Sequence, residues 1–373
     1  MTVSLDEIKE LNKELKNLKT EEVYKFLNTI SLNGISKERE SQNTHIPNLN
    51  KAFKEEDLVL VLGAGVSVPY NLPSWENLLQ KLLFETFNAS NNNEDTSSIL
   101  SKLFPKLFPS SPLISARFLE NYFKKHKNGK TFEEMIKDAL YENIKRNEDS
   151  PILKEILQYC IAPGKSPNLD SIITYNYDDI LEVVLTNSNV DIPFKSVYTL
   201  GMNPNNGELP IYHVHGYLPE KQKIEQDYSV TLSENLYHKQ YNDIYSWNNM
   251  VQINKFREKT CLLIGLSLTD PNIRRLLDIA MLQKGNQPKY HYLFKKRYDV
   301  NTLGRGLELI LNNNEPLLDE KARANMRLDE TAKHLLEKME EFEEIDADSF
   351  GIKIIWINDF DEIADYLNKI RTL

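Results

Sequence analysis

Cysteine is almost absent from this chain of 373 residues, which contains only Cys160 and Cys261. Two thiols cannot supply a four-cysteine zinc site or a framework of several disulfides. Their apolar neighbours, LQYC and TCLLIG, indicate that both lie in the core. We therefore expect no structural zinc and no other bound metal.

Long apolar runs and an excess of positive charge are also missing. No apolar run approaches the roughly 20 residues of a membrane-spanning helix, and the N-terminus, MTVSLDEIKE, lacks the pattern of a signal peptide. The formal net charge of −10 argues against nucleic-acid binding as the main role. The sequence therefore predicts a cytoplasmic protein that binds neither a membrane nor, directly, a nucleic acid.

Residues 1–50 are predicted to be an N-terminal helical extension and linker. Between residues 5 and 30, Leu, Ile, Val and Phe recur at helical spacing among Lys and Glu, which is typical of amphipathic helices. The polar stretch GISKERESQNTHIPN follows them and indicates a linker. We expect this extension to serve assembly or docking, and the protein to be a homo-oligomer.

Residues 51–373 are predicted to form one α/β domain with a doubly wound, mostly parallel sheet. Short β-rich segments alternate with helical ones, which is typical of a parallel sheet covered by helices on both faces. The predicted strands are LVLVL (58–62), SIITYN (171–176), IYHVHG (211–216), YSVTL (228–232), TCLLIGLS (260–267), KYHYLF (289–294) and GIKIIWI (351–357).

A helical insertion at about residues 88–165 is predicted between the first two strands. Its first part, Asn88 to Ser98, is rich in Asn, Ser and acidic residues and predicts a surface loop. The rest has helical periodicity, and Thr131 with Glu134 predicts a capping box at the start of a helix.

The first predicted strand ends in Gly63-Ala64-Gly65, and Ser67 follows. A strand, a glycine turn and a following helix can present backbone N–H groups to a phosphate. The third glycine of the usual dinucleotide fingerprint is replaced by Val68, so this motif alone also fits a strand-ending turn without a ligand.

Three further predicted strands end in the polar motifs TYNYDD (174–179), HVHG (213–216) and GLSLTD (265–270). In open parallel sheets, ligands bind beyond the carboxyl ends of the strands. The carboxamide of Asn176 can donate and accept there, although Asn and Asp before a helix also suit its N-terminus. His213 and His215 are predicted to share one strand face, as metal ligands would, but no third ligand is apparent. We therefore interpret His215 as a side chain beside a ligand.

These four motifs, in the order GAG-x-S, T-x-N-Y-D, HG and G-x-S, resemble those of the sirtuin superfamily. More narrowly, they resemble the sirtuin-like domains of bacterial antiphage defence systems, over about residues 58–280. The resemblance implies a Rossmann-like, sirtuin-type fold in which the glycine turn holds the pyrophosphate of NAD. The site residues that it implies are catalytic Asn176 and His215 and NAD-binding Gly63, Ala64, Gly65, Ser67, Asp178, Gly265 and Ser267.

Two departures from the deacetylating sirtuins indicate the activity. No cysteine precedes Cys261 between the HG and G-x-S motifs, so their zinc module is missing, and Tyr175 stands where they have Gln. Both departures match the defence-type domains, for which the resemblance implies cleavage of NAD to nicotinamide and linear or cyclic ADP-ribose. It also implies abortive infection by NAD depletion, with a separately encoded partner such as a ring ATPase of the HerA type or an Argonaute. The alternatives are a non-catalytic module that binds NAD or ADP-ribose to regulate a partner, and a zinc-free deacylase, which the missing cysteines disfavour.

Overall fold

The computed structural model describes residues 44–91, 93–108, 110–126, 129–161, 169–223, 230–285, 289–313 and 327–373. The helices predicted between residues 5 and 30 lie outside these ranges. The described chain divides into two compact units, a larger one that ends with Ser349–Leu373 and a smaller one formed by Lys296–Asp348. The predicted separation of residues 1–50 from the rest stays a prediction.

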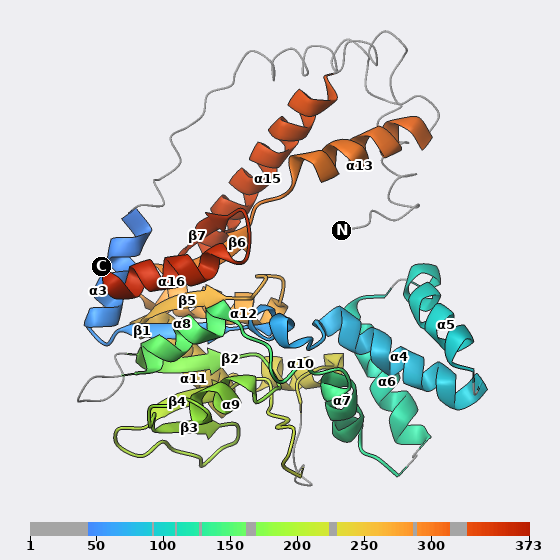
Figure 1. The fold of residues 1–373 in the computed structure, drawn as a ribbon, viewed down its shortest axis with the longest axis horizontal. Coiled ribbons are helices and arrows are strands. Elements are labelled where there is room, and N and C mark those ends of the chain that lie inside the picture. The colour runs from blue at the N-terminus through green and yellow to red at the C-terminus, as the bar shows by residue number, and fades with distance from the viewer. Residues whose placement is uncertain are drawn as a thin grey trace. The chain divides into compact units, whose positions relative to one another are not determined.

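A seven-stranded parallel sheet forms the centre of the larger unit (Figure 1). Its strands are β1 (Leu58–Leu62), β2 (Leu169–Thr174), β3 (Phe194–Val197), β4 (Leu209–His213), β5 (Thr260–Ile264), β6 (His291–Lys296) and β7 (Ile352–Ile357). They lie in the order β3-β4-β2-β1-β5-β6-β7, and β1 is buried along its whole length. A buried central strand needs apolar residues on both faces, which explains the continuous run LVLVL. The predicted doubly wound α/β fold is confirmed.

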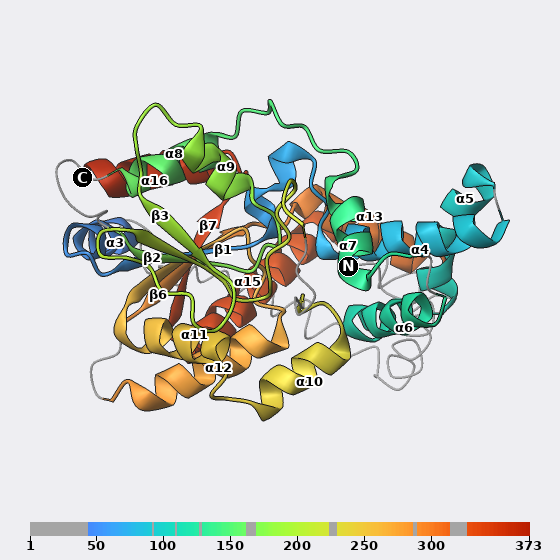
Figure 2. The same cartoon turned by 90° about the horizontal axis from the view of Figure 1, so that it is seen from below.

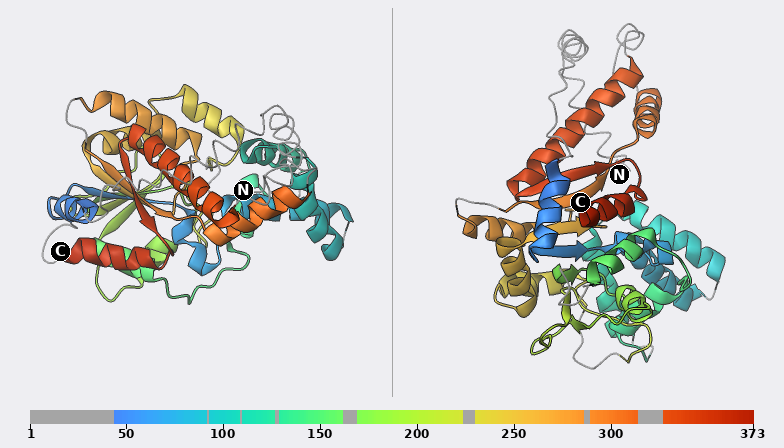
Figure 3. Two further views of the ribbon diagram at one scale, coloured as in Figure 1. Left: turned by 90° about the horizontal axis from the view of Figure 1, so that it is seen from above. Right: turned by 60° about the vertical axis from the view of Figure 1, so that its left-hand side comes forward.

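Helices cover both faces of this sheet (Figures 2 and 3). One face carries α8 (Pro151–Cys160), α9 (Ile180–Thr186) and α16 (Glu362–Thr372), with α3 (His45–Lys54) packed on α16, and the other carries α10 (Glu234–Asn242), α11 (Trp247–Glu258) and α12 (Pro271–Gln283). Helix α12 begins at Pro271, because the Asp270 side chain accepts the N–H groups of the first turn and proline suits that position.

Four helices between β1 and β2 form a block beyond the carboxyl end of β1 (Figure 1). They are α4 (Trp75–Asn91), α5 (Glu94–Leu107), α6 (Pro112–Lys125) and α7 (Phe132–Tyr141). The block has its own apolar core, separate from the one around the sheet, to which Leu82, Leu119 and Ile136 contribute. The predicted capping box of Thr131 and Glu134 is present at the start of α7.

Two local predictions are wrong. Asn88 to Ser98 is not a surface loop, because α4 continues to Asn91 and the side chain of Asn93 starts α5 by accepting the N–H of Thr96 at 2.9 Å. The run YSVTL forms no strand over its described residues 230–232. Its apolar residues Val230 and Leu232 pack into the core of the helical block instead.

In the smaller unit, the described helices are α13 (Val300–Asn313) and α15 (Leu328–Ser349). Arg297 forms an ion pair with the fully buried Glu340 of α15, which fixes the start of this unit to its long helix. None of the helices described in either unit is long and apolar enough to cross a membrane.

Candidate active site

The loops that follow β1 and β5 touch each other through glycine. A Cβ atom on residue 65 would lie 2.6 Å from Gly265 Cα, and one on residue 63 would lie 2.6 Å from the Gly265 carbonyl oxygen. The Gly65 N–H donates to that oxygen at 3.0 Å. Gly265 itself has a φ of +70°, which favours glycine. The fold therefore needs the three glycines at the predicted positions whether or not a ligand is present.

Most N–H groups of the glycine turn donate hydrogen bonds to backbone carbonyls of the protein. The donors are Gly63, Gly65, Val66 and Ser67, and their acceptors are the carbonyls of Ile264, Gly265, Gly63 and Ala64. Two short 3₁₀ turns, η2 (Ala64–Val66) and η3 (Val68–Tyr70), follow β1, so the first α-helix begins only at Trp75. Ala64 and Gly65 are exposed, so a ligand can approach the backbone there. Pyrophosphate binding by this turn stays a prediction.

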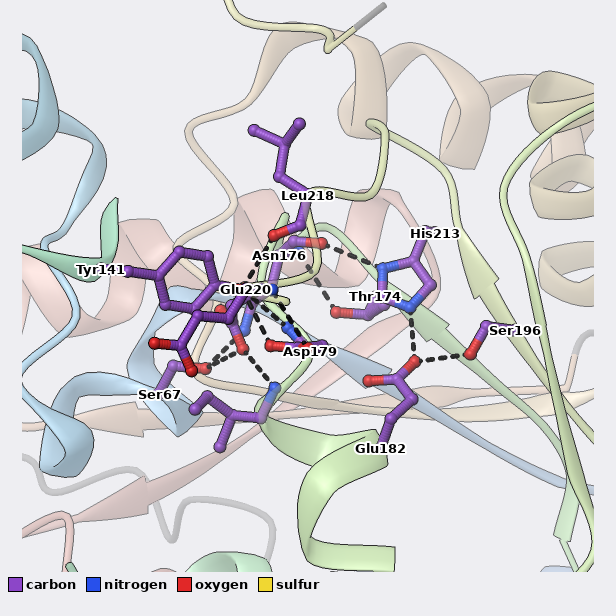
Figure 4. A network of polar contacts seen from close by, with 12 residues as sticks. Ser67, Tyr141, Thr174, Asn176, Asp179, Glu182, Ser196, His213, Leu218 and Glu220 are labelled. Atoms are coloured by element: carbon purple, nitrogen blue, oxygen red, sulfur yellow. Dashed lines mark hydrogen bonds and ion pairs between the residues drawn. The ribbon is translucent and has the colours of Figure 1, made fainter. Parts of the chain in front are cut away.

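A chain of hydrogen bonds orients Asn176 just beyond the end of β2 (Figure 4). Asn176 Nδ2 donates to Ser67 Oγ at 3.0 Å, and Ser67 Oγ donates to Asp178 Oδ1 at 3.1 Å. All three side chains are buried. This chain engages the amide nitrogen, and within the described part of the chain Asn176 Oδ1 stays available to accept a hydrogen bond from another group. Ser67, which the motif predicts to bind NAD, therefore has a positioning contact with the predicted catalytic Asn.

The carboxyl group of Asp178 has a raised pKa. Burial raises its pKa to about 6, although hydrogen bonds from the Ile180 N–H and the Ser67 hydroxyl lower it. A carboxylate that accepts two hydrogen bonds is thus still costly to ionise at this depth. Near neutral pH the group is mostly charged, and it becomes protonated as the pH falls through about 6.

We expect Asp178→Asn to stabilise the protein at pH 8 relative to the wild type. A carboxyl whose pKa is raised in the folded state contributes stability below its unfolded pKa and loses it as the pH rises through the folded pKa. The difference between 3.8 and about 6 is equivalent to about 3 kcal/mol. The stabilisation should shrink toward pH 4, where the wild-type carboxyl is protonated. Denaturant unfolding of both proteins from pH 4 to 8 measures it, and a difference that does not change with pH would contradict this expectation.

His215 lies two residues beyond β4, so the prediction that it shares a strand face with His213 is wrong. Its ring is buried edge-on against Tyr175, with ring centroids 4.7 Å apart, and against Tyr237, at 5.7 Å. Its Nε2 atom has no hydrogen-bond partner among the described residues. Burial lowers the pKa of His215, while the Asp270 carboxylate opposes this effect. The imidazole is therefore neutral at pH 7 and can accept a proton.

The walls around His215 include residues that sequence reasoning missed. Tyr237 on α10 donates its hydroxyl to Asp270 Oδ2 at 2.5 Å, and the Tyr175 hydroxyl donates to Gln252 on α11. Helices α10 and α11 were not predicted, because their sequences carry no motif at a strand end. Among the residues of this wall, only Asp270 belonged to a predicted motif, as the last residue of GLSLTD.

The helical block also contacts the loop that follows His215. The Tyr141 hydroxyl on α7 lies 2.9 Å from Asp179 Oδ1 and 2.8 Å from the Leu218 carbonyl oxygen (Figure 4). It also accepts the N–H of Asp179 at 3.1 Å. No sequence signal pointed to this contact, because its partners lie 38 and 77 residues away.

The remaining predicted residues stand apart from this network. Ser267 is exposed, and its hydroxyl contacts Thr269 Oγ1 at 2.8 Å. Cys160 and Cys261 are free, buried thiols. Within the part of the chain that the structure describes, no group of three or more His, Cys, Asp or Glu side chains is placed to hold a metal ion.

A parallel sheet with paired glycine loops and a polar cluster at its carboxyl edge defines a Rossmann-like α/β protein with its candidate site at that edge. Residues 170–317 match the family described as the SIR2-like domain. This match confirms the predicted resemblance to sirtuin-like domains.

Curated relatives extend this similarity over most of the chain. The chain is 23% identical to the NAD(+) hydrolase ThsA of Enterococcus faecium over 87% of its own length and 57% of the relative. It is 21% identical to the protein of that name from Cytobacillus dafuensis, over 86% of the chain and 54% of the relative. It is 22% identical to the protein of that name from Bacillus cereus (strain MSX-D12), over 87% of the chain and 56% of the relative. The chain therefore spans a little more than half the length of these relatives.

Proposed function

We propose that this protein is an NAD hydrolase that cleaves the bond between nicotinamide and ribose. The observation that carries the proposal is the placement of two side chains just beyond the ends of the paired strands β2 and β4. They are an oriented Asn176 and a neutral His215 whose Nε2 has no hydrogen-bond partner within the described residues. The names of the curated relatives support it. The exposed backbone of Ala64 and Gly65 lies at the same edge, where the resemblance predicts the pyrophosphate.

In the proposed mechanism, the residues mainly position the reactants. Nicotinamide leaves as a neutral group and the ribose passes through an oxocarbenium-like state, so the departing ring needs no protonation. Asn176 Oδ1 accepts a hydrogen bond from the attacking water or a ribose hydroxyl, and its amide nitrogen is fixed by Ser67. His215 Nε2 takes up the proton that the water loses. Because burial lowers the pKa of His215, the imidazole is neutral at neutral pH, and it acts as the tautomer that carries its proton on Nδ1.

Within this proposal, NAD depletion serves antiphage defence by abortive infection in the cytoplasm. The product is ADP-ribose, linear or cyclic. The protein acts as a homo-oligomer with a separately encoded partner, a ring ATPase of the HerA type or an Argonaute. These parts of the proposal rest on the resemblance to defence-type sirtuin-like domains alone.

Purified protein incubated with NAD tests the activity directly. We expect nicotinamide and ADP-ribose to appear in equal amounts, measured by chromatography, and calorimetry to detect NAD binding. Binding of NAD without turnover would overturn the hydrolase proposal and support a non-catalytic module. Release of nicotinamide only in the presence of an acylated lysine peptide would support a deacylase.

Removal of residues 1–41 is expected to lower the oligomeric mass and leave the SIR2-like domain folded. The cut is placed before α3 because His45 is buried and its ring lies 5.4 Å from that of Tyr292. Light scattering measures the mass, and circular dichroism measures the fold. A truncated protein with an unchanged number of subunits would contradict an assembly role for this segment.

A further inference from the structure

Glu182 and His213 form a buried pair next to Asn176 (Figure 4). His213 is the last residue of β4 and is paired with Thr174, the last residue of β2. Its Nε2 lies 2.7 Å from Glu182 Oε1 on α9, and its Nδ1 lies 3.3 Å from the backbone carbonyl oxygen of Asn176. The imidazole therefore bridges helix α9 and the backbone of the predicted catalytic Asn.

The acceptors determine where the protons of His213 lie. A carbonyl oxygen can only accept, so Nδ1 must carry a proton and donate it to Asn176. On the other side, a single proton lies between Nε2 and Glu182 Oε1, where the Ser196 hydroxyl also donates to the carboxylate at 2.8 Å. Glu182 thus sets the orientation of the ring, and with it the direction of the Nδ1–H bond.

A water-sized cavity lies beside this pair. Its volume is about 10 Å³, and Ser67, Asn176, Asp178, Glu182 and His213 all line it. Glu182 Oε2, the second oxygen of the buried carboxylate, has no hydrogen-bond partner among the described residues. An apolar pair of similar volume would fill this space without burying a charge, and such replacements are often neutral or stabilising. Fold stability alone therefore does not account for a polar pair at this position.

We propose that His213, oriented by Glu182, is a positioning residue that holds Asn176 for NAD cleavage. The proposal rests on the proposed function. Asn176 is then held at three points, since its N–H donates to Thr174 Oγ1 at 3.1 Å, its carbonyl accepts from His213 and its side chain donates to Ser67. A displacement of about 1 Å in a group that orients a reactant can cost about 100-fold in rate.

Two isosteric substitutions separate the two contacts of His213. The amide nitrogen of Asn occupies the place of Nδ1, so His213→Asn keeps the donor to Asn176 and loses the contact with Glu182. The amide nitrogen of Gln occupies the place of Nε2, so His213→Gln keeps the contact with Glu182 and loses the donor to Asn176. We expect His213→Gln to lower kcat for NAD cleavage about 10- to 100-fold with KM within about threefold, and His213→Asn to keep kcat within about threefold.

A second pair of variants keeps the test decisive if a His213 variant does not fold. Glu182→Gln can still hydrogen-bond to His213, whereas Glu182→Leu fills the space without holding the ring. We expect Glu182→Leu to fold and to lose about 10-fold in kcat, and Glu182→Gln to lose less than about threefold. A crystal structure of His213→Gln should show the Asn176 side chain displaced from Ser67.

The outcomes distinguish this proposal from the proposed function. A wild-type protein that does not cleave NAD would refute the function itself. With an active wild type, equal losses of kcat in His213→Asn and His213→Gln, or wild-type kcat in both His213→Gln and Glu182→Leu, would overturn the positioning role. Losses of kcat that correlate with a lowered melting temperature, and not with loss of the donor to the Asn176 carbonyl, would also overturn the positioning role. They would indicate a structural role only.

Discussion

His215→Ala is expected to lower the rate of NAD cleavage by about 10²- to 10⁴-fold, the usual contribution of a general acid–base group. The ring is buried and its Nε2 atom has no partner within the described residues, so the alanine removes a proton acceptor without breaking a hydrogen bond of that atom. NAD binding should persist. Nicotinamide release measures the rate, and calorimetry measures the binding.

The pH profile gives this prediction a second readout. Because burial lowers the pKa of His215, the base form persists below the ordinary value of 6.5, and wild-type activity should fall only at lower pH. The exposed His126 is the control, since alanine there removes an imidazole with no assigned role in the site. Wild-type turnover by His215→Ala would refute the assigned base.

Asn176→Ala should have an effect of similar size for a different reason. It removes the carboxamide that the Ser67–Asp178 chain orients, and positioning of a nucleophile contributes as much as proton transfer or more. Asn187→Ala, at an exposed residue that follows α9, is the control. The loss should appear in kcat more than in KM.

Gly65→Val is expected to destabilise the larger unit with its parallel sheet, with NAD binding lost as a consequence. Its Cβ would lie 2.6 Å from Gly265 Cα, a backbone atom, so the β1 and β5 loops must separate to admit it. Overpacking of a well-packed contact typically costs about 1–3 kcal/mol, and backbone displacement adds to this cost. Thermal unfolding without NAD should show a clearly lower melting temperature.

Gly304→Ala is the control for this substitution. Gly304 lies in α13, and a Cβ there would meet no atom within 4 Å. Replacing a helical glycine with alanine should therefore stabilise the helix, by up to about 1 kcal/mol. A Gly65→Val protein with the wild-type melting temperature and no NAD binding would show that the glycine serves the ligand and not the contact between loops.

The sequence by itself determined the elements whose signals are local. LVLVL predicted a strand, and Thr131 with Glu134 predicted a capping box, because each depends on neighbouring residues only. The alternation of β-rich and helical segments was sufficient to predict a parallel sheet, and the motifs at the strand ends predicted the edge for the candidate site. Local signals gave the wrong prediction at Asn88 to Ser98. The side chain of Asn93 caps the start of α5 there, so helix replaces most of the predicted loop.

Only the tertiary structure decided how the predicted site residues are used. Gly65 was predicted to make room for a phosphate, yet it also meets Gly265, 200 residues away, across two adjacent strands. Ser67 reaches Asn176 and Asp178, which follow β2, and His213 reaches Glu182 on α9. Strand order and helix placement bring these groups within about 3 Å, and both depend on how the whole chain packs. Hydrogen bonds act over such distances only, so a sequence pattern can name the participants of this network but not their partners.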